Sequence, residues 1–188
     1  VDYYKGEEVT VEFYRDLHTL GYDLIVLRAH SNYIQKYLSL AMFTSEPYSK
    51  ERYVQEQLRN RVARGFIEPY HEGDPHYLVI TDKFVRHSMK GYFKDTLIIM
   101  MGCNSMKKCM ATAFLEKGAK VYIGWDGLVS AGHTDLATIQ LLKQLLLEKQ
   151  TIAKALGRTM EAVGSEPQYK NTLLFWPIEA GDNKVQKP

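Results

Sequence analysis

The chain has 188 residues, of which 45% are hydrophobic and 24% are charged, and these proportions exclude a disordered or low-complexity protein. Its net charge of +2 comes from basic and acidic residues scattered along the chain, so no basic stripe indicates a nucleic-acid partner. No apolar run approaches the roughly 18 residues that a membrane-spanning helix needs, and two cysteines are too few for a disulfide framework.

The first half of the chain mixes strand and helix patterns. A helix is expected at 9–20, where Val9, Phe13, Leu17 and Leu20 share one face and Gly21 follows as a terminator. The run Leu24 to Leu27 is apolar without interruption, which predicts a strand covered on both faces. The other elements expected here are strands at 1–5, 37–45, 64–69 and 77–81 and helices at 50–61 and 82–90.

The second half alternates more regularly. We expect strands at 96–101, 119–124 and 172–176, and helices at 106–117, 134–148 and 151–163. Strands that alternate with helices favour right-handed crossovers, so the fold class is α/β with a mainly parallel sheet and helices on both faces. The prediction is one domain over residues 1–178 and a polar tail over 179–188.

Two reactive residues follow the two most apolar strands. His30 comes shortly after the strand at 24–27, and Gly102-Cys103 follows the strand at 96–101. Because sites in α/β sheets form at the carboxyl ends of strands, the imidazole and the thiol are expected at one edge. A helix beginning near Met106 and an adjacent imidazole would both favour a thiolate nucleophile. A cysteine or histidine in such a place is also often purely structural, and only the conjunction of the two favours catalysis.

Two blocks of the sequence carry a resemblance to a known group. Leu24-Ile-Val-Leu-Arg-Ala-His30-Ser31 and Leu97-Ile-Ile-Met-Met-Gly-Cys103 resemble the blocks of the caspase, gingipain, clostripain, legumain and separase peptidases, where strands end in His and then Cys. The stretch from Met110 to Trp125 resembles the helix and strand after the cysteine in gingipain-like members. The likeness runs from about Tyr22 to Trp176.

The resemblance implies a caspase-like three-layer sandwich and a cysteine endopeptidase acting on a peptide or protein substrate. His30 would be the general acid/base and Cys103 the nucleophile, and the N–H groups of Ser31 and Cys103 would form the oxyanion hole. Ser31 stands where the family usually has glycine, and the His-to-Cys separation, 103 − 30 = 73 residues, exceeds that of several relatives. The family's first strand would lie upstream of Val1.

The same resemblance places a specificity pocket near Trp125 and Asp126. Asp126 would select a basic side chain before the cleaved bond, although a turn residue beside Gly127 explains it equally well. Cys109 is expected in the core and His87 on a helix surface. Loop composition accounts for the residues from His71 to His76, so neither a metal nor another cofactor is predicted. The alternatives are a catalytically silent caspase-like peptide-binding or scaffolding domain, and a glutamine amidotransferase, whose nucleophile usually precedes its histidine.

Overall fold

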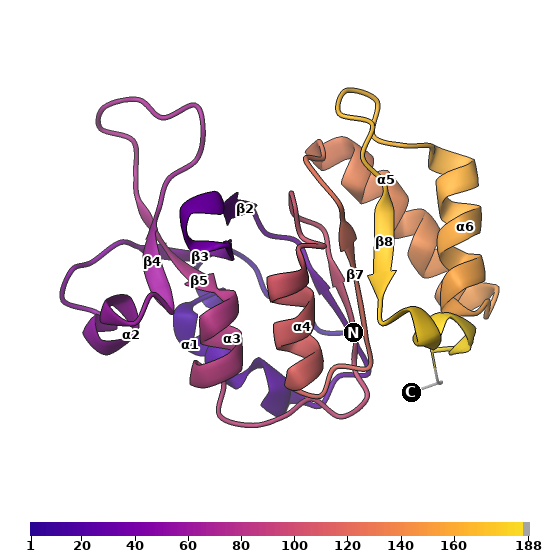
Figure 1. The fold of residues 1–188 in the computed structure, drawn as a ribbon, viewed down its shortest axis with the longest axis horizontal. Coiled ribbons are helices and arrows are strands. Elements are labelled where there is room, and N and C mark those ends of the chain that lie inside the picture. The colour runs from indigo at the N-terminus through magenta and orange to yellow at the C-terminus, as the bar shows by residue number, and fades with distance from the viewer. Residues whose placement is uncertain (186–188) are drawn as a thin grey trace.

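A mainly parallel sheet forms the centre of the computed structural model, which describes residues 1–185 (Figure 1). Its strands lie in the order β1 (Leu24–Leu27), β6 (Leu97–Met100), β7 (Val121–Trp125) and β8 (Leu173–Trp176). The first three are parallel, and β8 runs antiparallel to β7. The predicted α/β class with a mainly parallel sheet is therefore confirmed for these four strands.

A second, antiparallel sheet was not predicted. It contains β2 (Ser31–Ile34), β3 (Ser39–Pro47), β5 (Tyr77–Thr81) and β4 (Val62–Gly65), in that order. The prediction missed β2 because Ser-Asn-Tyr-Ile has no apolar run, and it missed the sheet because pairing partners cannot be seen in single segments. Much of the segment between His30 and Cys103, from Ser31 to Thr81, thus builds a sheet of its own.

Helices cover both faces of the parallel sheet, but several differ from their predicted lengths. Gly21 ends the first helical segment in the left-handed conformation, φ 70°, as predicted. The predicted strand at 1–5 was wrong, because these residues form no ladder. The α-helices are α1 (Val11–Asp16), α2 (Val54–Leu58), α3 (Asp82–Ser88), α4 (Lys108–Glu116), α5 (Ala131–Leu142) and α6 (Ile152–Val163). A π-helical turn, Lys143–Leu147, extends α5, and 3-10 helices span Gly6–Glu8, Leu17–Leu20, Gln35–Tyr37 and Ile178–Asp182.

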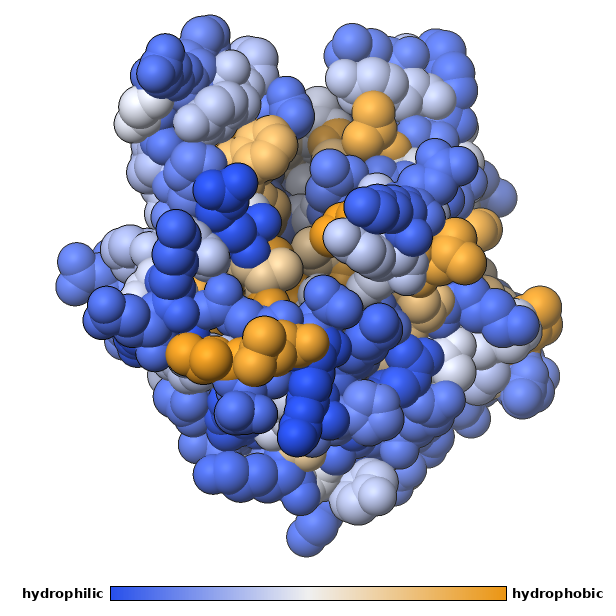
Figure 2. Space-filling view, turned by 60° about the vertical axis from the view of Figure 1, so that its left-hand side comes forward, coloured by the Kyte–Doolittle hydropathy of each residue, from blue (hydrophilic) through white to orange (hydrophobic). Residues whose placement is uncertain are grey.

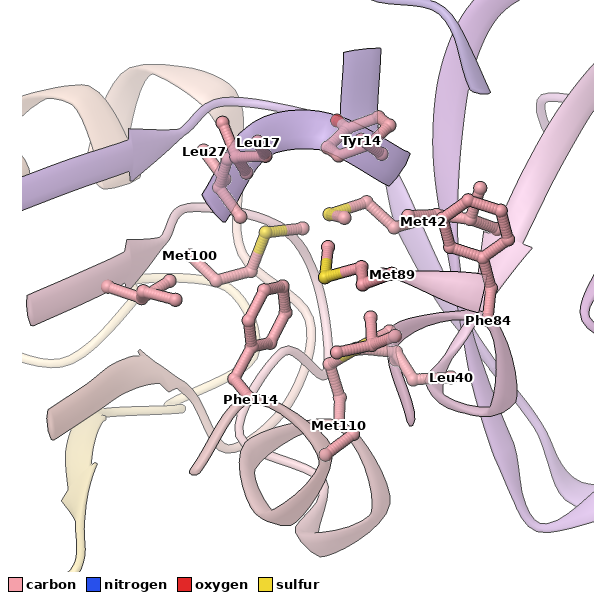
Figure 3. Close-up of a cluster of buried hydrophobic side chains, with 14 of the residues drawn as sticks. Tyr14, Leu17, Leu27, Leu40, Met42, Phe84, Met89, Met100, Met110 and Phe114 are labelled. Atoms are coloured by element: carbon pink, nitrogen blue, oxygen red, sulfur yellow. The ribbon is translucent and has the colours of Figure 1, made fainter. Parts of the chain in front are cut away.

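Alternating side chains of β6 divide the interior into two cores. Ile98 and Met100 point into a core shared with the second sheet and with α1, α3 and α4, and Figure 3 shows part of it, rich in methionine. Leu97 and Ile99 point into the other core, against α5 and α6. Strand β6 is fully covered, whereas β1 is an edge strand whose Val26 is 36% exposed. The prediction that both faces of the strand at 24–27 are covered was therefore wrong.

The residues after 178 pack onto the domain. Ala180 is buried in the core that contains α6, and the N–H of Ile152 donates to the carbonyl of Asn183 at 2.9 Å. The stretch predicted as a polar tail thus begins as part of the packed structure. Among the described residues, no helix is both long and apolar enough to cross a membrane.

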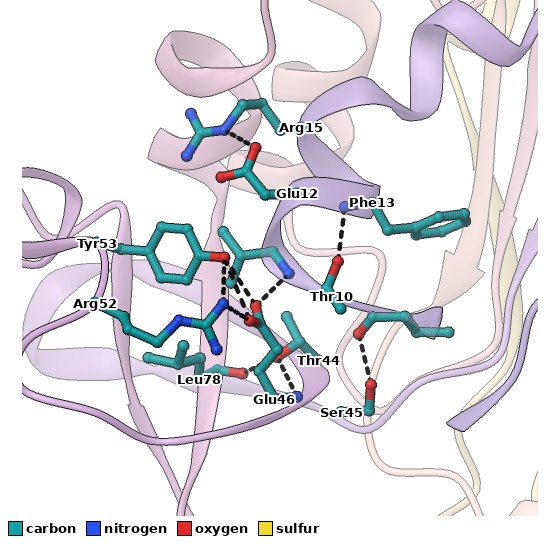
Figure 4. Close-up of polar contacts among 12 residues, drawn as sticks. Thr10, Glu12, Phe13, Arg15, Thr44, Ser45, Glu46, Arg52, Tyr53 and Leu78 are labelled. Atoms are coloured by element: carbon teal, nitrogen blue, oxygen red, sulfur yellow. Dashed lines mark hydrogen bonds and ion pairs between the residues drawn. The ribbon is translucent and has the colours of Figure 1, made fainter. Parts of the chain in front are cut away.

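A buried carboxylate joins α1 to the antiparallel sheet. Glu46 on β3 accepts a hydrogen bond of 2.7 Å from the N–H of Val11, the first residue of α1 (Figure 4). The same carboxylate accepts the hydroxyl of Tyr53 and pairs with the guanidinium of Arg52. It therefore satisfies a helix amide that has no partner within the helix.

Replacing Glu46 by glutamine should lower the free energy of unfolding by about 1.5–3 kcal/mol, the usual contribution of hydrogen bonds to a charged group. Urea denaturation followed by circular dichroism measures the change. Glu51→Gln is the matched control, because Glu51 is exposed and lies only five residues away. Its effect should stay within about 0.5 kcal/mol. Equal effects of the two substitutions would contradict a structural role for the Glu46 carboxylate.

Candidate active site

The strand register places His30 and Cys103 at equivalent positions. Leu27 of β1 pairs with Met100 of β6, so the parallel ladder has an offset of 100 − 27 = 73 residues. The same offset, 103 − 30 = 73, separates the histidine from the cysteine. The ladder continues past β6, because the N–H of Met101 donates to the carbonyl of Leu27 at 2.9 Å. The two residues thus leave neighbouring strands at the same edge.

The two strand ends approach each other so closely that only glycine fits between them. A Cβ atom at Gly102 would lie 2.2 Å from Ser31 Oγ and 2.6 Å from the carbonyl oxygen of Ala29. The Ser31 hydroxyl also donates to the carbonyl of Cys103 at 2.6 Å. Gly102 therefore lets the segment that carries His30 contact the segment that carries Cys103.

Hydrogen bonds hold the loop that carries Cys103 against β7. Ser105 is completely buried; its hydroxyl donates to the carbonyl of Met100 and accepts the N–H of Trp125. The N–H of Asn104 donates to Gly127 at 2.7 Å, and Asn104 has the left-handed φ of 55° that asparagine tolerates well. These contacts hold the loop in a sharp turn directly after the thiol.

The helix after the cysteine begins later than predicted. A turn spans residues 103–106, and α4 starts at Lys108 rather than near Met106. The field of a helix terminus falls off within one turn, and Cys103 precedes the first residue of α4 by five residues. The predicted helix start near Met106 was therefore wrong.

The thiol of Cys103 contacts the backbone of Val129. The N–H of Val129 donates to the sulfur and the thiol donates to the Val129 carbonyl, both at 3.5 Å. His30 is exposed, and the edge of its ring faces Phe43, with 6.1 Å between the ring centroids. Within residues 1–185, the His30 ring makes no hydrogen bond to Cys103 and no contact with a carboxylate. The two side chains therefore lie at one edge without being joined directly.

Two backbone N–H groups at this edge have no acceptor in the described part of the chain. The N–H of Phe43 donates to the carbonyl of His30, so in the antiparallel pattern the N–H of Ser31 points away from β3. The N–H of Cys103 lies in the turn and makes no hydrogen bond to residues 1–185. These two amides are the donors that the resemblance assigns to an oxyanion hole.

Trp125 and Asp126, the predicted substrate-binding residues, have partners of their own. Trp125 is fully buried, and its indole N–H donates to the Thr134 hydroxyl at 2.9 Å. Asp126 is exposed, and its carboxylate accepts the N–H of Thr172 at 2.8 Å. In this conformation Trp125 offers no surface to a substrate, and Asp126 acts as a link between the ends of β7 and β8.

The edge that bears His30 and Cys103 lies between two projections. In Figure 1 the β4–β5 loop and the loop before β8 rise on either side of it. Figure 2 shows a hollow between two such projections, with hydrophobic residues inside it. The β4–β5 loop carries mutually packed rings of Phe66, Tyr70 and His76. His30 also lines a pocket of about 130 Å³.

Several residues of the site were not predicted. Val129 contacts the thiol, and Arg28 pairs with Asp135 at the pocket rim with distances of 2.8 and 2.9 Å. The sequence around Val129 does not indicate a contact with Cys103, because the two residues are 26 positions apart and meet only in the folded chain. The left-handed turn at Asn104 could have been predicted, since asparagine directly after Gly-Cys at a strand end favours this conformation. No group of three or more His, Cys, Asp or Glu side chains in residues 1–185 is arranged to hold a metal ion.

Neither a protein-family model nor a curated protein matches the chain in sequence comparisons.

Proposed function

We propose that the protein is a cysteine peptidase in which Cys103 attacks the peptide carbonyl and His30 transfers protons. The observation that carries this proposal is the shared register of the two residues on adjacent parallel strands, beside two N–H groups that lack an acceptor. A nucleophile, a base and an oxyanion site are the three parts that acyl transfer needs. The caspase-like arrangement implied by the sequence blocks supports the same function.

In the proposed reaction, His30 takes the thiol proton, and the Cys103 sulfur forms a bond to the carbonyl carbon of the scissile peptide. The negative charge on the carbonyl oxygen is then stabilised by the N–H groups of Ser31 and Cys103. His30 returns the proton to the leaving amine as the C–N bond breaks. Water, deprotonated by His30, then hydrolyses the thioester. The imidazole must turn toward the sulfur, which its exposed position permits.

A peptide library with all residue types at each position tests the activity, because it assumes no specificity. Incubation with the protein should produce new peptide ends, detectable by mass spectrometry, that are absent when Cys103→Ala replaces the wild type. A complete lack of cleavage by the wild type, with Cys103 still reactive toward alkylating agents, would contradict the peptidase.

One observation favours the alternative, a caspase-like domain that binds peptides without cleaving them. The Cys103 sulfur contacts Val129 rather than the His30 ring. Under this alternative the library would remain uncut, and labelled peptides would bind equally well to wild type and to Cys103→Ala.

The two cysteines provide a simpler test of the nucleophile. We expect iodoacetamide to label Cys103 at least about tenfold faster than Cys109 at neutral pH. Burial, and secondarily the charge of Asp82, raise the pKa of the Cys109 thiol, whereas Cys103 has an imidazole at its edge of the sheet. Peptide mapping after timed labelling measures both rates, and His30→Ala should slow only Cys103. Equal rates at the two cysteines would count against an activated thiol.

A further inference from the structure

A small pocket lies beside residues that neighbour Cys103, although Cys103 itself does not line it. Its wall includes Val129, whose N–H and C=O both contact the sulfur at 3.5 Å. His30 and Gly102, which directly precedes the thiol residue, line it as well. A side chain flanking a carbonyl attacked by Cys103 would therefore enter this pocket.

Apart from His30, the polar side chains around the pocket already have partners. The Thr134 hydroxyl donates to the carbonyl of Met101 at 3.1 Å and accepts the indole N–H of Trp125. At the rim, Asp135 binds the Arg28 guanidinium through two hydrogen bonds. A cationic group that entered the pocket would lose its water without gaining a carboxylate partner from the lining residues, which is costly. Besides the His30 ring, what remains for contact is the apolar surface of Ala29, Met101, Val129 and Ala131 and the Gly102 backbone.

The size of the pocket limits its occupant. Its volume is about 130 Å³, close to the roughly 150 Å³ apolar cavity that accepts benzene in an engineered protein. A branched group of three or four carbons suits this volume. We infer that the pocket between His30, Gly102 and Val129 binds a small aliphatic side chain of the substrate, of the size of valine or leucine.

This inference rests on the proposed peptidase for the identity of its ligand, and it replaces the basic specificity that Asp126 suggested. Asp126 does not line the pocket, and its carboxylate is bonded to Thr172. The nearer acidic group, Asp135, is neutralised by Arg28. Burial of an aliphatic side chain in this pocket should favour binding, because it removes apolar surface from water and leaves no polar group of that side chain unpaired.

Substituted iodoacetamides test the pocket without requiring hydrolysis. The Cys103 sulfur displaces iodide, so that an S–C bond forms, the C–I bond breaks and the thiol proton passes to the solvent. With rates normalised to those of glutathione, N-isobutyl iodoacetamide should label Cys103 about tenfold faster than N-(3-aminopropyl) iodoacetamide. A ratio of one or less would overturn the inference.

A second test fills the pocket with a larger side chain. Ala131 is exposed at the start of α5 and lines the pocket, so Ala131→Phe should occupy the space without disturbing the core. This variant should lose the isobutyl preference, measured as the ratio of the two labelling rates in the same variant, while Leu136→Phe, at an exposed position of α5 outside the pocket, should keep it. A preference that survives Ala131→Phe would contradict the assignment. If the preference behaves as expected but the peptide library stays uncut, the pocket stands and the peptidase function fails.

Discussion

Replacing Cys103 by alanine should reduce peptide hydrolysis at least about 10³-fold, because the variant has no atom that can form the acyl intermediate. His30→Ala should lower the rate by about 10²–10⁴-fold, the contribution of a positioned acid/base. The double variant should be no slower than Cys103→Ala, since residues that act as a unit have non-additive effects. Hydrolysis of a peptide selected from the library measures all three rates.

The chain offers matched controls for these substitutions. Cys109→Ala removes the other thiol, and His87→Ala removes an exposed imidazole from α3. Both should keep at least about half of the wild-type rate if the fold is preserved. If Cys103→Ala and His30→Ala each lost only a few-fold in rate, or if their effects multiplied independently, the two residues would not work together.

Replacing Gly102 by alanine should affect both stability and activity. The added Cβ would overlap the Ala29 carbonyl and the Ser31 hydroxyl, so the His30 segment must move away from the Cys103 loop. Overpacking of this kind costs about 1–3 kcal/mol of unfolding free energy. A shift of about 1 Å at the reacting groups would lower hydrolysis by about 10²-fold.

Gly157→Ala is the control for this prediction. Gly157 lies within α6, and a Cβ there would meet nothing within 4 Å, so alanine should leave stability unchanged or raise it by up to about 1 kcal/mol. Urea denaturation and peptide hydrolysis are measured on both variants. If the Gly102→Ala variant kept the wild-type stability and hydrolysis rate, the close approach of the two segments would not be needed for folding or for activity.

The parts of the fold that the sequence predicted are those fixed by local pattern. The strand of β5 was predicted at its observed bounds, Tyr77–Thr81, and β1 and β6 were placed to within two residues because their apolar runs are unmistakable. The same runs did not reveal that β1 lies at an edge, since exposure depends on which strands pair. The short helix α2 was overestimated because Lys50 to Arg61 has good helix formers but buries no residue in the helix that forms.

The candidate site was likewise predictable only where the local sequence pattern decides the structure. The placement of His30 and Cys103 at the ends of two strands follows from the apolar runs before them, but their common register does not, because pairing is a tertiary property. For Trp125, the position in the sequence led to a wrong prediction. Its position after a strand suggested a substrate contact, yet its large apolar ring is buried in the core and its N–H is satisfied by Thr134.

The antiparallel sheet between His30 and Cys103 uncouples distance along the chain from distance in space. The ladder between β1 and β6 sets the spacing of the two residues, whatever the length of the intervening segment. The β4–β5 loop projects from that segment at the upper left of Figure 1. A fluorescent reporter domain inserted into this loop would be joined to two paired strands and should leave the ladder between β1 and β6 intact. The loop is therefore a point where a label can be attached without altering His30 or Cys103.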